Sequence, residues 1–101
     1  MDPERVRRTS KVLVGNRYRL EIASAVAQLQ SDIFHAKELA DALGLPLNVV
    51  SQQVKAFVTV GVCEDVPAVA GQRQRFFRRV PCSYWTGCAV LLDELSQLSS
   101  R

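Results

Sequence analysis

The stretch from Glu38 to Val62, ELADALGLPLNVVSQQVKAFVTVGV, constrains the fold of this chain more than any other. It holds two runs of apolar residues at the spacing of an amphipathic helix, and Gly44 and Pro46 stand between the runs. Glycine accepts the left-handed conformation that ends many helices, and proline fits the first turn of a helix, where no backbone N–H is needed. We therefore expect a helix over residues 36–43 and a second helix to about residue 60, joined as a helix-turn-helix.

The spacing of apolar residues changes from helical to alternating after Gly61. Residues 62–66 and 73–80 predict two strands that pair back as an antiparallel hairpin. The dipeptide Ile33–Phe34 is too short for a real strand, but it can add a bridge to a small sheet. The sequence therefore predicts a hairpin directly after the helix-turn-helix.

Helices are also predicted near both ends of the chain. Residues 3–14 can form a helix with Asp2 as its N-cap, and Asn16 can cap a second helix over about residues 17–30. Ser83 caps a last helix that runs to about residue 98. The result is a mainly α fold with a small β-hairpin, in a single domain of 101 residues.

This order of elements resembles the winged helix-turn-helix, and most closely the small dimeric bacterial repressors of the ArsR-like class. The resemblance covers about Val12 to Leu98 and rests on the pattern E-L-A-x-x-L-G-L-x-x-x-x-V-S-x-x-V-K-x-F-x-x-x-G-V. It implies an N-terminal helix or arm, the helix-turn-helix, a wing and a C-terminal dimerisation helix, over residues 1–14, 36–60, 62–80 and 83–98.

The resemblance implies a homodimeric, sequence-specific DNA-binding transcription regulator that needs no cofactor and is not an enzyme. Metal-sensing members carry cysteines in the first helix of the motif, whereas that helix reads KELADALG here and has none. The acidic and histidine pairs that some members hold on the last helix are also missing. No metal site is therefore expected.

The second helix of the motif, residues 47–60, is expected to enter the major groove, which is wide enough to admit it. Its inward face takes Val50, Val54 and Phe57, which leaves polar side chains on the opposite face. A glutamine amide can donate and accept hydrogen bonds together, as the edge of adenine requires. The candidate DNA contacts of this helix are Leu47, Asn48, Val49, Gln52, Gln53 and Lys55.

Positive charge concentrates in two clusters at either end of a slightly acidic body. The stretch GQRQRFFRR, residues 71–79, holds four arginines and no acid, in a chain of net charge +3. Arg73 and Arg75 lie nearest the tip of the wing and are the candidates for contact with the phosphate backbone. A second basic cluster near the N-terminus can add nonspecific affinity; it comprises Arg5, Arg7, Arg8 and Lys11.

Alternation along the second strand of the wing divides its side chains between two faces. Phe76 is expected to face the core, with Arg78 at the rim, paired with Glu64 or Asp65 of the facing strand. Phe77 then falls on the outer side, where it has no obvious burial site.

The last helix is apolar on more than one face, which favours a partner over a single internal contact. The resemblance implies a dimer formed by the first and last helices. The candidate dimer contacts are Val6, Val12, Leu13, Trp85, Leu91, Leu92 and Leu95.

Composition excludes several other classes. No apolar run is long enough to span a membrane and the N-terminus is polar, so a cytoplasmic protein is expected. With His35 as the single histidine and no glycine-rich phosphate loop, the chain offers no catalytic constellation. The three cysteines, Cys63, Cys82 and Cys88, contain no CxxC motif and are expected to act as small apolar residues.

Two alternatives remain open on the sequence. A winged helix can serve as a nucleoprotein or protein-interaction module without a specific operator, because this fold does not fix function. The cysteines also leave room for a thiol-based, redox-responsive repressor.

Overall fold

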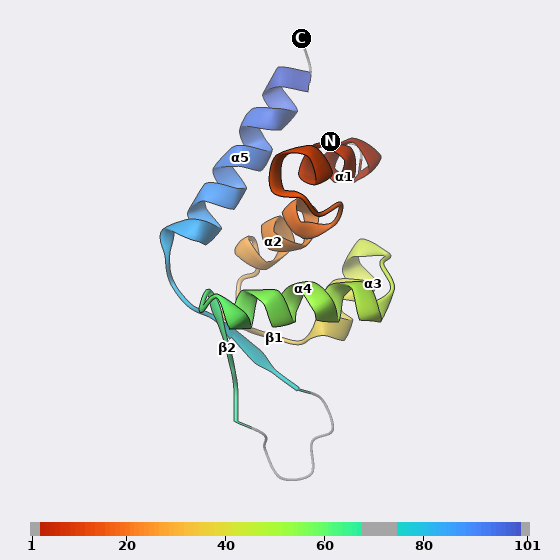
Figure 1. The fold of residues 1–101 in the computed structure, drawn as a ribbon. Helices are drawn as coiled ribbons and strands as arrows, with labels where there is room; N and C mark the ends of the chain where they lie inside the picture. The colour runs from red at the N-terminus through yellow and green to blue at the C-terminus, as the bar shows by residue number, and fades with distance from the viewer. Residues whose placement is uncertain (1–2, 68–74, 100–101) are drawn as a thin grey trace. The chain divides into compact units, whose positions relative to one another are not determined.

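The computed structural model describes residues 3–67 and 75–99, which form two compact units (Figure 1). The first, here called the helical unit, draws on Met1–Gln28 and Cys82–Arg101. The second, the wing unit, is Leu29–Pro81. Asp2, the predicted cap of the first helix, lies outside the described residues.

The helical unit consists of α1 (Pro3–Val14), α2 (Arg19–Ala27) and α5 (Ser83–Ser99), and α2 packs against both of the others. The reason is the composition of α2, which is apolar on nearly all sides and therefore has to be covered. Its buried residues are Leu20, Ile22, Ala23, Ser24 and Val26. The first helix forms as predicted. The last helix begins at Ser83 itself, the residue predicted to cap it, and ends one residue beyond the predicted end.

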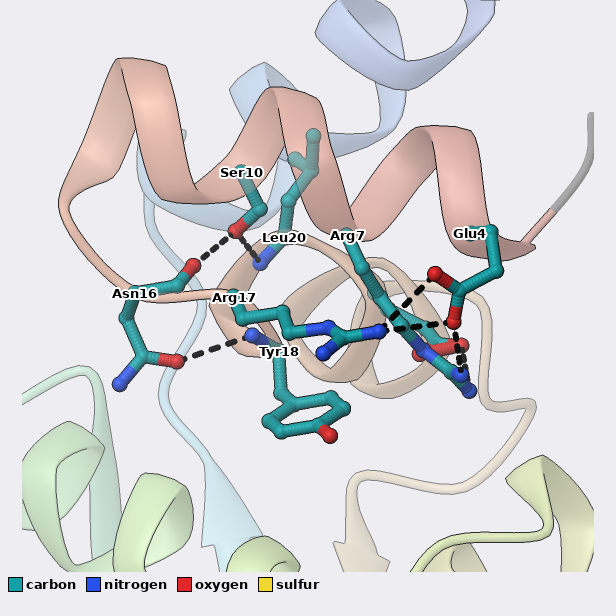
Figure 2. Close-up of polar contacts among 8 residues, drawn as sticks. Glu4, Arg7, Ser10, Asn16, Arg17, Tyr18 and Leu20 are labelled. Carbon is teal, nitrogen blue, oxygen red and sulfur yellow. Dashed lines mark hydrogen bonds and ion pairs between the residues drawn. The ribbon is translucent and has the colours of Figure 1, made fainter.

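A buried serine fixes the turn between α1 and α2 (Figure 2). The Ser10 hydroxyl donates to the Asn16 carbonyl and accepts from the Leu20 N–H, with 3.0 Å between the Leu20 nitrogen and Ser10 Oγ. Asn16 Oδ1 accepts from the Tyr18 N–H at 2.9 Å. Asn16 was expected to cap the helix itself, but α2 begins later, at Arg19, so its side chain stabilises the turn instead.

The wing unit contains the predicted helix-turn-helix, α3 (Ala36–Leu43) and α4 (Leu47–Thr59), which lie side by side. Gly44 has φ 65°, the left-handed conformation expected of it, and its N–H donates to the Ala40 carbonyl to close the end of α3. Val50, Val54 and Phe57 are buried along α4, which confirms the predicted inward face.

The sheet of the wing unit is antiparallel with the order β1-β3-β2. Its strands are β1 (Ile33–Phe34), β2 (Cys63–Asp65) and β3 (Phe77–Arg79), and β3 pairs with both neighbours. The wing hairpin is confirmed, with shorter strands than the 62–66 and 73–80 that alternation predicted. The bridge foreseen for Ile33–Phe34 is also present, as a third strand.

The two phenylalanines of the wing lie opposite to the expected way. Phe77 is buried, with 7 % of its surface exposed, whereas Phe76 is only half-buried and makes a T-shaped ring contact with His35. The pairing of β3 with β1 explains this. Phe34 lies directly opposite Phe77, so the two side chains share a face, and their rings lie tilted against each other with centroids 6.0 Å apart. The prediction that Phe76 faces the core is wrong because alternation gives the period of a strand but not its phase.

This register predicts unequal costs for two neighbouring substitutions. We expect Phe77→Ala to lower the free energy of unfolding by about 3–5 kcal/mol, because it removes a buried ring and leaves a cavity. Phe76→Ala should cost clearly less, because its ring is half-buried. Urea unfolding followed by circular dichroism measures both, and the milder pair Phe77→Leu and Phe76→Leu ranks the sites if the first variant does not fold. A larger loss at Phe76 would contradict the register.

Candidate nucleic-acid interface

The outward face of α4 is polar, and the helix contains no acidic residue. Leu47, Asn48, Gln52 and Lys55 are exposed, and Val49 is half-buried. Lys55 is the single charged side chain of the helix. This surface offers amide groups beside a cation, and the helix has no carboxylate that would repel a polyanion. It is therefore suited to contact the base edges and phosphates of a nucleic acid.

Gln53 does not belong to this outward face. Its side chain is buried, with 5 % exposure, so the prediction that it lies opposite the core is wrong. Successive residues of a helix differ by about 100°, so Gln53 falls three residues after Val50 and four before Phe57, within the buried stripe. Of the two adjacent glutamines, Gln52 is therefore the exposed one.

The described arginines of the wing each bond to an acid of the same unit. Arg78 Nη1 donates to Glu64 Oε1 at 3.0 Å, which confirms the pairing expected at the rim, and the two residues lie directly opposite in the sheet. Arg79 binds Asp32 at 2.7 Å and also donates to the Leu29 carbonyl at 3.1 Å. These bonds attach β3 to its neighbours, so neither arginine is simply a solvated charge.

Arg75, one of the two predicted phosphate contacts, forms an ion pair with Asp65 and lies over the Phe77 ring at 5.6 Å. Its side chain is 68 % exposed. An ion pair this exposed is worth about 0–1 kcal/mol, so it holds the guanidinium at the surface without preventing an exchange for another anion. The second predicted contact, Arg73, lies outside the described residues.

The predicted dimer residues divide into core and surface. Val6 and Trp85 are buried inside the chain, so their assignment to an interface is wrong; they form part of the core. Val12 is 82 % exposed. Leu91, Leu92 and Leu95 of α5 are half-buried, and nothing is described of the Leu13 side chain.

The basic cluster near the N-terminus is partly neutralised within the helical unit (Figure 2). Arg7 makes two bonds to the Glu21 carboxylate, at 2.8 and 3.2 Å, and a third to Glu4. Its hydrogen bond to Glu21 is the main reason that the pKa of Arg7 is raised. Arg17 also binds Glu4, at 2.8 Å. The exposed cations that remain on α1 are Arg5, Arg8 and Lys11.

The three cysteines occupy different environments: Cys63 is buried, Cys82 exposed and Cys88 half-buried. Burial raises the pKa of Cys88, and the neighbouring Cys82 raises it further, against a hydrogen bond from Tyr84 that lowers it. A raised pKa keeps the sulfur protonated at neutral pH, which is the opposite of what a reactive sensor thiol needs.

Neither a cluster of metal ligands nor a helix that could span a membrane occurs within residues 3–67 and 75–99. No group of three or more His, Cys, Asp or Glu side chains there is arranged to hold a metal ion. No helix there has the length and apolar character needed to cross a membrane.

Comparison with known proteins supports the fold. No protein-family model matches the chain, and no curated protein matches it either. Among solved structures it is similar to wild-type MarR (apo form) from E. coli, with a TM-score of 0.60 and 15 % identity over 98 % of this chain and 68 % of the other. A structure described as a transcriptional regulator has a TM-score of 0.63 and 20 % identity, over 97 % of this chain and 68 % of the other. The reduced form of MarR from E. coli scores 0.59 at 17 % identity, with 98 % and 68 % covered. The chain therefore has the winged helix-turn-helix fold, mainly helical with a small antiparallel sheet.

Sequence reasoning missed three polar residues beside the outward face of α4: His35, Lys37 and Ser51 line the same pocket as Leu47 and Lys55. A partial signal was present, because positions 47, 51 and 55 recur every four residues and so share one ridge of α4. His35 and Lys37 reach this pocket only through the packing of α3 beside α4, so no regular spacing in the sequence relates them to the residues of α4.

The environments of the cysteines predict their order of reaction. At neutral pH we expect iodoacetamide to alkylate Cys82 well before Cys88, because Cys82 is exposed and the raised pKa of Cys88 leaves little thiolate. The rate at Cys88 should still be rising above the ordinary pKa of a cysteine. Mass spectrometry of the digested protein measures both rates, with urea-unfolded protein as the control. Faster alkylation of Cys88 than of Cys82 at neutral pH would contradict this environment.

Proposed function

We propose that this chain is a homodimeric, sequence-specific DNA-binding transcription regulator. The observation that carries the proposal is the outward face of α4, which is free of acid and exposes Asn48, Gln52 and Lys55 on a winged-helix fold. The structural likeness to a protein described as a transcriptional regulator is consistent with it. All 101 residues are proposed to act as one winged-helix domain.

In this proposal α4 enters the major groove, which is about 12 Å wide and admits a helix. Asn48 and Gln52 lie four residues apart on one ridge and can each bond the edge of a base. Leu47 and Val49 offer apolar contact to a thymine methyl, and Lys55 reaches a phosphate. Gln53 is left out of the contact set because it is buried.

The wing is proposed to bind the phosphate backbone beside this helix. Arg75 supports this because its guanidinium is exposed and Asp65, the acid that pairs with it, is itself exposed. Phosphate can therefore replace the carboxylate at little cost in free energy. Arg73 remains a candidate from the sequence alone.

Two surfaces of the helical unit support a homodimer. Along α1 the exposed residues include Arg5, Arg8 and Val12; on α5 they include Asp93 and Glu94. The two helices thus carry charges of opposite sign, so α1 of one copy and α5 of another are complementary. A two-fold axis would use this contact twice. The half-buried leucines of α5 then gain cover from the partner; they are Leu91, Leu92 and Leu95.

Membership of the ArsR-like class in particular stays a prediction, because the solved structures reported above are MarR and a transcriptional regulator. A cytoplasmic location stays a prediction as well.

If binding is sequence-specific, one substitution on α4 should affect binding to a selected duplex more than binding to an unrelated one. We expect Gln52→Ala to weaken binding to a duplex selected from a random pool by about 1–3 kcal/mol, because it removes a base contact. Binding to an unrelated duplex should be nearly unchanged, because phosphate contacts dominate there. Fluorescence anisotropy at fixed salt measures both affinities. Equal loss on the two duplexes would favour a nucleoprotein module without a specific operator.

The proposed dimer surface predicts that two valine-to-aspartate substitutions weaken the dimer to different extents. Val12→Asp should raise the dissociation constant of the dimer at least about tenfold, because a carboxylate is costly in an apolar contact. Val60→Asp is the matched control, since Val60 is a 72 % exposed valine directly after α4, in the wing unit, whereas the proposed surface belongs to the helical unit. Size-exclusion chromatography with light scattering measures both. A monomeric wild type, or equal weakening by the two substitutions, would contradict the proposed dimer surface.

A further inference from the structure

A pocket of about 280 Å³ opens in the wing unit between the start of α3, the outward side of α4 and strand β3. Its floor is apolar and includes Ala36, Leu47 and Phe77. Three cationic side chains stand around it, Lys37 from α3, Lys55 from α4 and Arg75 from the wing. An apolar floor within a ring of cations favours a ligand that is negatively charged at one end and apolar beside it.

The two lysines differ from the arginines of the same unit. Arg78 and Arg79 are each held by an acid. Lys37 and Lys55 are exposed and form no ion pair with any residue in the described part of the chain. Among the described residues of the unit, the two cations without an acid partner therefore line one pocket, where an anion would meet two solvated ammonium groups.

Hydrogen bonding at the start of α3 sets the position of Lys37. His35 Nδ1 accepts from the Glu38 N–H at 3.2 Å and so caps the helix, with Lys37 one residue before that N–H. The Phe76 and His35 rings make a T-shaped contact with centroids 5.5 Å apart, which ties this turn to the wing. Ser51 adds a hydroxyl from α4 at the same pocket. The cations thus come from α3, from α4 and from the residues just before β3, which border the same pocket.

The arrangement of side chains along α4 favours the backbone of a DNA strand, rather than a small free anion, as the ligand of this pocket. Leu47, Ser51 and Lys55 form one ridge of the helix, and Asn48 and Gln52 form the next ridge. When a helix lies in the major groove, the phosphates of a strand run alongside the ridge that faces the bases. A ridge that offers a hydroxyl and an ammonium next to the ridge proposed for base contact matches that arrangement.

We propose that this pocket seats one backbone phosphodiester of bound DNA, with its sugar against Leu47 and its phosphate between Lys37 and Lys55. This inference rests on the proposed function, and it adds Lys37 and Ser51, from outside the predicted contact set, to the DNA interface.

Salt dependence provides the first test, with a duplex selected by wild-type protein from a random pool. Each neutralised phosphate contributes about −0.9 to the slope of log K against log salt. The double variant Lys37→Gln/Lys55→Gln should flatten the slope by about 0.9. Arg17→Gln, an exposed cation in the turn between α1 and α2 that does not line the pocket, changes the net charge without touching the pocket and should keep the wild-type slope. Lys37→Arg/Lys55→Arg should restore the slope.

A scan of single methylphosphonate linkages, which are uncharged, provides the second test. One linkage position should weaken wild-type binding and have no further effect on the double glutamine variant, because the same contact is already lost. Circular dichroism confirms that the variants are folded.

The possible outcomes distinguish a failure of the proposed function from a failure of the phosphate pocket alone. A wild type that binds no duplex would overturn the proposed function and the pocket with it. A wild type that binds, while the double variant keeps the wild-type slope and the same sensitive linkage, would overturn the pocket alone.

Discussion

The pairing of β3 with β1 is the constraint on which the rest of the wing depends. It sets Phe77 against Phe34 in the core and so determines which side chains of β3 point outward. The bonds of Arg79 to Asp32 and to the Leu29 carbonyl attach β3 to the segment that leads into β1. With this register in place, Arg75 emerges beside the outward side of α4, where both line one pocket. A shift by one residue would exchange the faces and remove that pocket's third cation.

The arginines of the wing are less available to bind an anion than their number suggests. The stretch from 71 to 79 has a formal charge of +4, yet its described arginines are matched by Asp65, Glu64 and Asp32. Their first effect is therefore to connect strands. The lysines, spread singly through the sequence, keep their charge available to an anion. The proposed DNA surface accordingly rests on α4 and the start of α3 as much as on the wing.

The sequence predicted what depends on local spacing and missed what depends on packing partners. Gly44 and Pro46 located the turn of the motif, and the helical period of the apolar residues located the inward face of α4. The phase of β3 could not be predicted, because it is set by a two-residue strand more than forty positions earlier in the chain. The sequence prediction assigned Gln53 to the outward face because it is polar, although its angular position on α4 places it among the buried residues. Lys37 was missed because nothing local relates it to Lys55 and Arg75.

The central claim is that one face, made by α4 with the start of α3 and the wing, binds DNA. Backbone amide spectra of the protein, titrated with a duplex selected from a random pool, test it most directly. The account predicts the largest chemical-shift changes along residues 47–55, at Lys37 and at Arg75, with smaller changes in the helical unit. Changes confined to α1 and α5, with the signals of α4 unmoved, would contradict it.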